Sequence, residues 1–455
     1  IKVYIYPELV PTPMLSFAVR RLHCSSGIII TASHNPAKYN GYKCYSHEGY
    51  QMTDAEANAT YECIRKVNIF NDVKTLDFDE GIKSGKIELI PSSVNEAFYE
   101  CVLSRRVNPD AVAKGKLKLI YTPLNGTGNK PVREVLKRAG FDDVTVVPSQ
   151  EHPDGHFPTC PYPNPEIRQA FEEALKLAQG KKADLLLATD PDCDRVGIAV
   201  NTGDGYKLMS GNEVGVLLTE YVLSSMKAAG TLPKNPVIVK SFVTTSLVDR
   251  VAESYGCEVR DVLTGFKYIG EIATELEKKN EGERFILGME ESYGYLSGLH
   301  ARDKDAVVSS MLICEMASFY KIQGKTLVQK MAEIYEKYGY YKNILLNFTF
   351  EGESGMEKMG DIMTSLRAGM KVIETADYKK SERVDILSGK VSEIKLPKSN
   401  VLAYKLPDGN SVIVRPSGTE PKLKAYVTAC GKDENHASAL GEQLGEAIEK
   451  ILGIK

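Results

Sequence analysis

An apolar stretch that runs straight into three regularly spaced acids constrains this chain more than any other feature. Residues 183–189 (ADLLLAT) form a short apolar run typical of a buried strand, and Asp190, Asp192 and Asp194 follow it. Alternate side chains of an extended segment point the same way, so these three acids can converge on one point. Converging carboxylates repel one another unless a cation lies between them, and oxygen ligands suit a hard ion such as Mg²⁺. Arg195 comes next and offers a rigid fork of donors to a phosphate or carboxylate.

Two other structures could account for this acidic stretch. A calcium-binding helix–loop–helix needs Gly at its sixth position and an acid at its twelfth, where this chain has Arg195 and Asn201. The sequence therefore excludes a loop of that kind. A polar turn between strands, with its acids solvated, remains open as the structural alternative.

Length and composition indicate a chain of several ordinary globular domains. At 455 residues the chain predicts about three or four domains. The net charge of −3 gives no reason to expect nucleic acid or an anionic membrane as a partner. Nine scattered cysteines without C-x-x-C spacing argue against disulfides or structural zinc, so a reducing, cytoplasmic location is predicted. No apolar run approaches the roughly 18 residues of a membrane span.

The first two predicted domains are α/β units, residues 1–107 and 108–211. In the first, a predicted buried strand over residues 27–32 ends directly before Ser33, where ligands of open α/β sheets gather. Ser33 could be a nucleophile, a phosphate carrier or a helix cap, and the residues around it leave all three open. The acidic stretch closes the second unit.

Residues 212–335 form a third predicted unit with groups that suit a sugar. Lys267 lies in a predicted loop and is a candidate for binding substrate or moving a proton. Glu290 and Ser292 stand at alternate positions after a predicted strand, a geometry that can hydrogen-bond adjacent sugar hydroxyls. A plain polar strand end explains this pair equally well.

Residues 336–455 have a different pattern, several strand-like segments followed by a final helix, which predicts an α+β domain. A predicted hairpin ends in residues 415–422 (RPSGTEPK), where a glycine flanked by hydroxyls, with Arg and Lys at the edges, builds a concave array of donors for phosphate. The strand ends of the four units thus offer a serine, a cation site, a lysine, a sugar clamp and a phosphate anchor. Together they predict phosphoryl transfer on a polyol phosphate.

The chain also resembles the α-D-phosphohexomutase family over essentially its whole length. The resemblance is carried by residues 31–36 (TASHNP), 190–195 (DPDCDR), 288–294 (GMEESYG) and 415–419 (RPSGT), in the family's order and approximate spacing. It implies a heart-shaped enzyme in which three similar mixed α/β sheet domains and a C-terminal α+β domain surround a central cleft. It also implies interconversion of glucose 1-phosphate and glucose 6-phosphate.

The resemblance further implies roles for individual residues. Ser33 would be the phosphoserine, Mg²⁺ would bridge it to Asp190, Asp192 and Asp194, and glucose 1,6-bisphosphate would be the intermediate and activator. Lys43 matches the family's proposed general acid/base, while His34 and Arg195 would support the phosphoryl group. The remaining residues would bind the sugar and its non-reacting phosphate: Lys267, Glu290, Ser292, Arg302, Lys304, Arg415, Ser417, Gly418, Thr419 and Lys422.

The sugar and the quaternary state are less constrained. Mannose and glucosamine branches of the family typically carry His after the sugar-binding Glu and Ser, whereas this chain has Gly294, with Arg302 and Lys304 nearby. Glucose is therefore favoured, with phosphomannomutase, phosphoglucosamine mutase, phosphopentomutase and a non-catalytic sugar-phosphate-binding protein as alternatives. The family usually has a further N-terminal segment with an Arg-bearing loop, so domain I is expected to lack a strand and the site a contact. A monomer or homodimer is expected.

Overall fold

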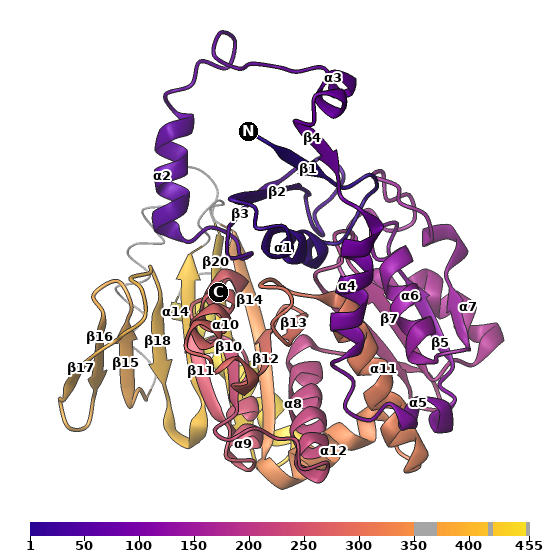
Figure 1. The fold of residues 1–455 in the computed structure, drawn as a ribbon. Coiled ribbons are helices and arrows are strands. Elements are labelled where there is room, and N and C mark those ends of the chain that lie inside the picture. Colours follow the sequence, from indigo (N-terminus) through magenta and orange to yellow (C-terminus); the bar gives the residue numbers. More distant parts are fainter. Residues whose placement is uncertain (350–370, 417–421, 452–455) are drawn as a thin grey trace. The chain divides into compact units, whose positions relative to one another are not determined.

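The computed structural model describes residues 1–349, 371–416 and 422–451, which form two compact units (Figure 1). The first unit contains Ile1–Ser241 and Val251–Lys330, and the second contains Phe242–Arg250 and Met331–Lys455. Within the described ranges, each helix is too short or too polar to cross a lipid bilayer. All nine cysteines are free thiols.

The N-terminal part of the first unit presents the serine loop on a short hairpin. Its elements are β1 (Val3–Ile5), α1 (Thr12–Arg21), β2 (Ser26–Ile30), β3 (Tyr42–Ser46), α2 (Asp54–Ile64), α3 (Phe78–Lys83), β4 (Ile87–Leu89) and α4 (Ser92–Leu103). Strand β2 pairs antiparallel with β3, and β1 pairs parallel with β4. The prediction of a buried strand before Ser33 is wrong, because Ile28 and Ile30 of β2 are 52% and 59% exposed. Helix α2 likewise has no buried residue.

A five-stranded mixed sheet follows, with the acidic stretch at the end of a fully buried strand. Its elements are α5 (Asp110–Gly115), β5 (Leu119–Thr122), α6 (Asn129–Ala139), β6 (Val144–Val146), α7 (Glu172–Lys181), β7 (Leu185–Thr189), β8 (Val196–Asn201) and β9 (Tyr206–Met209). In the order β6-β5-β7-β8-β9, β5 is parallel to β6 and β7, and β8 is antiparallel to β7 and β9. Helices α6 and α7 lie beside this sheet (Figure 1). Strand β7 is buried throughout, as expected of a strand covered on both faces.

A four-stranded sheet repeats this arrangement in the next domain. Its elements are α8 (Gly211–Ala228), β10 (Val237–Ser241), α9 (Leu247–Glu253), β11 (Glu258–Val262), α10 (Phe266–Lys278), β12 (Phe285–Glu290), β13 (Gly294–Ser297), α11 (Ala306–Ile322) and α12 (Leu327–Tyr338). In the order β11-β10-β12-β13, the first three strands are parallel and β13 is antiparallel to β12. Helix α10 begins at Phe266, so Lys267 lies in its first turn rather than in the predicted loop.

Three loops of the first unit occupy the same topological position. The serine loop joins β2 to β3, the acidic loop joins β7 to β8, and residues 291–293 join β12 to β13. Each loop connects a strand to its antiparallel neighbour. Helix α11 is buried on almost all sides and contacts α5, α6 and β13, so it connects the second and third domains.

The second unit contains an antiparallel sheet in the order β14-β20-β19-β18-β15-β16-β17. Its elements are β14 (Tyr340–Thr349), β15 (Glu374–Asp377), β16 (Glu382–Asp385), β17 (Val391–Glu393), β18 (Leu402–Lys405), β19 (Ser411–Pro416), β20 (Lys422–Gly431) and α14 (Glu434–Ile451). Val412, Val414, Leu423 and Val427 of the sheet form a core with Ile448 of α14. This unit is the predicted α+β domain, with the predicted hairpin formed by β18 and β19.

Candidate active site

Contacts from three domains fix the backbone of the acidic loop. The carbonyl of Pro191 accepts hydrogen bonds from the N–H (2.8 Å) and the hydroxyl (3.0 Å) of Thr127. The N–H of Thr12, at the start of α1, donates to the carbonyl of Asp192 at 2.9 Å. The N–H of Ala306, at the start of α11, donates to the carbonyl of Cys193 at 3.3 Å. The loop is therefore held in one shape before any ligand binds.

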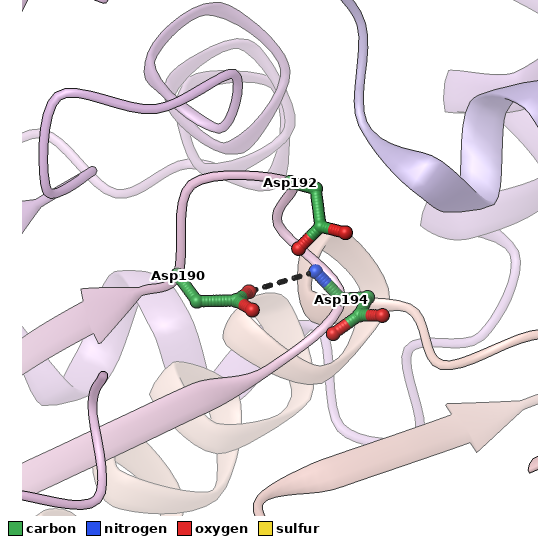
Figure 2. Close-up of side chains that lie close together, drawn as sticks. All are labelled: Asp190, Asp192 and Asp194. Carbon is green, nitrogen blue, oxygen red and sulfur yellow. Dashed lines mark hydrogen bonds between the residues drawn. The ribbon is translucent and has the colours of Figure 1, made fainter. Parts of the chain in front are cut away.

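The three aspartates of this loop converge as predicted (Figure 2). They do so in a turn rather than in the extended segment that the prediction assumed, because the N–H of Cys193 donates to the carbonyl of Asp190 at 2.9 Å and Cys193 has a φ of +51°. One carboxylate oxygen from each of Asp190, Asp192 and Asp194 lies within 4.8 Å of the others, and all three residues are buried. Oδ1 of Asp190 accepts the N–H groups of Asp194 (3.0 Å) and Arg195 (2.9 Å), the first of which is drawn in Figure 2. Burial and repulsion by Asp192 raise the pKa of Asp190 well above its usual range.

Two oxygens of this cluster fit the ligands of a hard cation. Oδ1 of Asp192 and Oδ1 of Asp194 are buried and accept no hydrogen bond from the described residues. A buried carboxylate oxygen without a donor is costly, and a divalent cation with oxygen ligands compensates it. The donor set therefore suits Mg²⁺, with the three aspartates as its protein ligands.

Two lysines neutralise part of this negative charge. Nζ of Lys43, on β3, lies 2.9 Å from Oδ2 of Asp192 and 3.2 Å from Oδ2 of Asp194. Nζ of Lys304 lies 3.1 Å from Oδ2 of Asp194 and 3.2 Å from Oδ1 of Asp303. Burial alone would lower the pKa of both ammonium groups, but the neighbouring carboxylates raise it above its usual value. Both lysines are therefore charged in this structure.

Ser33 places its hydroxyl against the aspartate cluster. Its Oγ donates to Oδ2 of Asp190 at 3.1 Å and lies 3.2 Å from Nδ1 of His34. The φ of Ser33 is +51°, a left-handed conformation that is strained for a residue with a side chain. Its N–H donates to Oγ1 of Thr31 at 2.8 Å, which helps to hold the turn. Burial, with the charge of Arg195, lowers the pKa of His34 to about 3, so this imidazole is neutral near pH 7.

Arg195 is the last residue of the loop before β8, and an acid that the sequence did not indicate holds its side chain. Its guanidinium Nη1 donates to Oε1 of Glu166 at 2.8 Å, while its Nε lies 3.9 Å from Oδ1 of Asp194. Glu166 follows the Pro-rich loop of the second domain. No short motif marks Glu166. The only feature of the sequence that could have indicated it is that an acid follows a proline-rich turn.

The end of β12 presents the predicted sugar-binding residues. Glu290 is buried, and its Oε1 accepts the N–H of Gly265 at 2.8 Å. Ser292 lies two residues further and is half-buried. The N–H of Val196, at the start of β8, donates to the carbonyl of Tyr293 at 3.0 Å, so the acidic loop and this loop are neighbours.

Two other predicted substrate-binding residues are engaged elsewhere. Nζ of Lys267 lies 2.5 Å from Oδ1 of Asp54, in α2. Arg302 is fully buried; its guanidinium donates to Thr274, to the carbonyls of Leu299 and Ala301, and to Glu277. These contacts make Arg302 part of the packing of α10 in this structure.

The predicted phosphate anchor is only partly described. Arg415 lies near the end of β19 with a half-buried side chain, and Lys422 begins β20. Ser417, Gly418 and Thr419 lie outside the described residues.

Comparison with known proteins agrees with this architecture. Models of the phosphoglucomutase/phosphomannomutase family match four consecutive parts of the chain: alpha/beta/alpha domain I at residues 1–69, domain II at 96–203, domain III at 210–338 and the C-terminal domain at 350–441. The chain belongs to the phosphoglucomutase/phosphomannomutase family.

Relatives of this family also match at the level of the whole chain. A phosphoglucomutase of Staphylococcus saprophyticus is 36% identical over 423 residues, which are 91% of this chain and 75% of that protein. A phosphoglucomutase of Staphylococcus aureus strain MRSA252 is 36% identical over 435 residues, 94% of this chain and 76% of that one.

Two solved structures have the same fold. A Paramecium structure described as pp63/parafusin (phosphoglucomutase), in its open form, has a TM-score of 0.74 at 16% identity and covers 100% of this chain and 82% of its own. A phosphoglucomutase/phosphomannomutase family protein of Burkholderia thailandensis has a TM-score of 0.66 at 18% identity, covering 99% and 83%.

The predicted family, the α/β fold class with a C-terminal α+β domain, and the enzyme class, a phosphohexomutase-type isomerase, are confirmed. The predicted domain boundaries after residues 107, 211 and 335 stay predictions. In this family member the structure brings Ser33, His34, Lys43 and Arg195 around the aspartates, and it adds Asp303 beside Lys304. Asp303 also accepts the hydroxyl of Tyr45 at 2.6 Å, a pairing across 258 positions that no local pattern could indicate.

Proposed function

We propose that this protein interconverts glucose 1-phosphate and glucose 6-phosphate by passing a phosphoryl group through Ser33. The contact of Ser33 Oγ with Asp190 at 3.1 Å, at the edge of a buried three-aspartate cluster, carries the proposal. A nucleophilic hydroxyl beside a divalent-cation site is what phosphoryl transfer requires. The staphylococcal relatives named phosphoglucomutase support glucose as the sugar.

In the first transfer, the bond between phosphorus and Ser33 Oγ breaks as a free hydroxyl of the sugar phosphate forms a new bond to phosphorus. The product is a sugar bisphosphate, glucose 1,6-bisphosphate, which also primes the unphosphorylated enzyme. After the bisphosphate reorients, its other phosphoryl group returns to Ser33 Oγ, and the isomeric monophosphate leaves. The phosphoserine is regenerated in each cycle, so the net reaction consumes no nucleotide.

Residues around the aspartates would serve both transfers. Asp190, Asp192 and Asp194 would hold Mg²⁺, which offsets the charge of the phosphoryl group. Lys43, whose Nζ lies against the same carboxylates, would be the general acid/base: its neutral amine would accept the hydroxyl proton, and the ammonium so formed would return it. His34 and Arg195 would support the phosphoryl oxygens next to Ser33.

Other side chains would select the sugar. Glu290 would accept a hydrogen bond from one sugar hydroxyl, and Ser292 would donate one to the adjacent hydroxyl. Lys304, beside the aspartate cluster, would also contact the sugar phosphate. The predicted contacts of Lys267 and of the loop with Arg415, Ser417, Gly418, Thr419 and Lys422 to the sugar phosphate remain predictions. So do a cytoplasmic location and a monomeric or homodimeric state.

The proposal is tested by turnover and by labelling. We expect glucose 1-phosphate to yield glucose 6-phosphate in a coupled dehydrogenase assay, and glucose 1,6-bisphosphate to add one phosphoryl group to Ser33, detected by mass spectrometry. Ser33→Ala should lose nearly all turnover and the added mass while retaining measurable binding of glucose 1,6-bisphosphate. Normal turnover of Ser33→Ala would contradict the carrier role. Rates on mannose, glucosamine and ribose 1-phosphates would decide among the family's substrates.

A further inference from the structure

A rigid turn carries Glu166 to the guanidinium of Arg195. The side chain of Asn164 accepts the N–H of Glu166 at 3.0 Å, and the carbonyl of Asn164 accepts the N–H of Ile167 at 3.1 Å. Pro165 lies so close to β8 that a Cβ added at Gly197 would be 2.5 Å from the Pro165 carbonyl oxygen. The turn and the strand that begins just after Arg195 are therefore locked together.

The backbone of Arg195 is equally fixed. Its N–H donates to Oδ1 of Asp190 at 2.9 Å, so its Cα has a set position relative to the aspartate cluster. The long side chain could still adopt many rotamers. The hydrogen bond from Nη1 to Oε1 of Glu166, at 2.8 Å, selects one of them and sets the plane of the guanidinium.

The Nε of this guanidinium is a buried donor left for a ligand. Nε of Arg195 is buried and makes no hydrogen bond to the described residues, and Oδ1 of Asp194, at 3.9 Å, is too far away to accept one. A buried, charged N–H without an acceptor is costly, so it marks a place for an acceptor that arrives with the substrate. An oxygen of a phosphoryl group fits the planar fork of donors that arginine presents.

We propose that Glu166 is a positioning residue that holds Arg195 in the orientation in which its unused N–H donors meet the phosphoryl group. The inference rests on the proposed function, because the phosphoryl group is the anion that the function brings to this place. Glu166 contacts neither sugar nor phosphate. It reduces the conformational freedom that Arg195 would otherwise lose when the substrate binds.

Kinetics of Glu166 variants separate this role from a merely structural ion pair. Glu166→Ala should lower kcat/KM about 10-fold to 100-fold, since a small misplacement of a phosphate-binding group has effects of that size. Glu166→Gln keeps an oxygen acceptor, so it should retain most of the kcat/KM that Glu166→Ala loses. The matched control is Glu151→Ala, because Glu151 pairs with Arg133 at 2.7 Å in the same domain and its side chain is 28% exposed, against 29% for Glu166. We expect Glu151→Ala to leave kcat/KM within about twofold of the parent.

A double-mutant cycle with Arg195→Met tests whether Glu166 acts through Arg195. If it does, Glu166→Ala should change kcat/KM by less than about twofold in the Arg195→Met background. Additive losses, or a Glu166→Ala variant as active as Glu151→Ala, would overturn the proposal.

The same double-mutant cycle is also measured as binding. Calorimetry gives the affinity for glucose 1,6-bisphosphate of each variant in a Ser33→Ala background. A parent without turnover would defeat the proposed function, but this binding cycle would still show whether Glu166 and Arg195 are coupled. Coupling in binding would then support the positioning role alone, and its absence would overturn that role. A parent that neither turns over nor binds the bisphosphate would overturn both.

Discussion

The backbone of Gly294 lies directly against the side chain of Lys304. A Cβ built on Gly294 would be 2.1 Å from Cδ and 2.6 Å from Cγ of Lys304, closer than carbon atoms can approach. The ammonium at the end of the same side chain reaches Asp194. The missing side chain at position 294 therefore gives Lys304 the path by which it reaches the aspartate cluster.

We expect Gly294→Ala to impair the enzyme by displacing Lys304. Overpacking of a buried site costs about 1–3 kcal/mol of the free energy of unfolding, and the displaced ammonium should lower kcat/KM about 10-fold or more. Urea denaturation and steady-state kinetics measure the two effects. Gly180→Ala is the control. Gly180 lies in helix α7, and a Cβ added there would have no atom within 4 Å. Unchanged kinetics of Gly294→Ala would show that the position of Lys304 does not matter for turnover.

Mg²⁺ should stabilise the protein as well as support turnover. We expect a chelator to abolish turnover and added Mg²⁺ to restore it, because the unpartnered oxygens of Asp192 and Asp194 suit this ion. A cation that binds only the native state also raises the thermal midpoint, which is measured by differential scanning fluorimetry. Asp192→Asn should lose this shift, while Asp204→Asn, in an exposed turn of the same domain, should retain it. Full activity in the chelator would contradict a metal role for the aspartates.

The carboxyl of Glu291, in the loop of residues 291–293, makes the free energy of unfolding depend on pH. Burial and the adjacent charge of Glu290 raise the pKa of Glu291 to about 7, although Ser241 donates a hydrogen bond to it at 2.9 Å. The unfolded chain releases this proton at lower pH than the native protein. Between the ordinary glutamate pKa and about pH 7 the native state therefore binds more protons, and the free energy of unfolding falls as pH rises.

Comparison with Glu291→Gln isolates this effect. The parent should lose stability relative to Glu291→Gln between about pH 5 and pH 8, by about 1–3 kcal/mol, and the difference should level off above that range. Urea denaturation of both proteins at several pH values measures the difference. A parallel pH dependence of the two proteins would show that Glu291 titrates normally.

The sequence predicted the reacting groups of the site better than the residues that hold those groups in place. Polar residues that follow apolar strands meet at the ends of sheets, so Ser33 and Asp190 could be expected to lie together although 157 positions separate them. Glu166 and Asp303 could not, because charge pairs between distant loops leave no periodic pattern. The prediction that β2 is buried failed for a related reason. A run of isoleucines shows that a strand forms but not that both of its faces are covered.

Glu315 of α11 provides a stability prediction away from the site. It is fully buried, and one of its carboxylate oxygens accepts the N–H groups of Val107 (2.9 Å) and Asn108 (3.1 Å) and the hydroxyl of Tyr221 (2.8 Å). Glu315→Ala would leave three donors unsatisfied and should cost about 3–5 kcal/mol of the free energy of unfolding. Tyr221→Phe removes one donor and leaves the two N–H groups on Oε1 of Glu315, so it should cost about 1 kcal/mol. Both variants should retain the KM of the parent at temperatures where they are folded. Equal costs for the two variants, measured by urea denaturation, would show that the carboxylate does not organise the segment before α5.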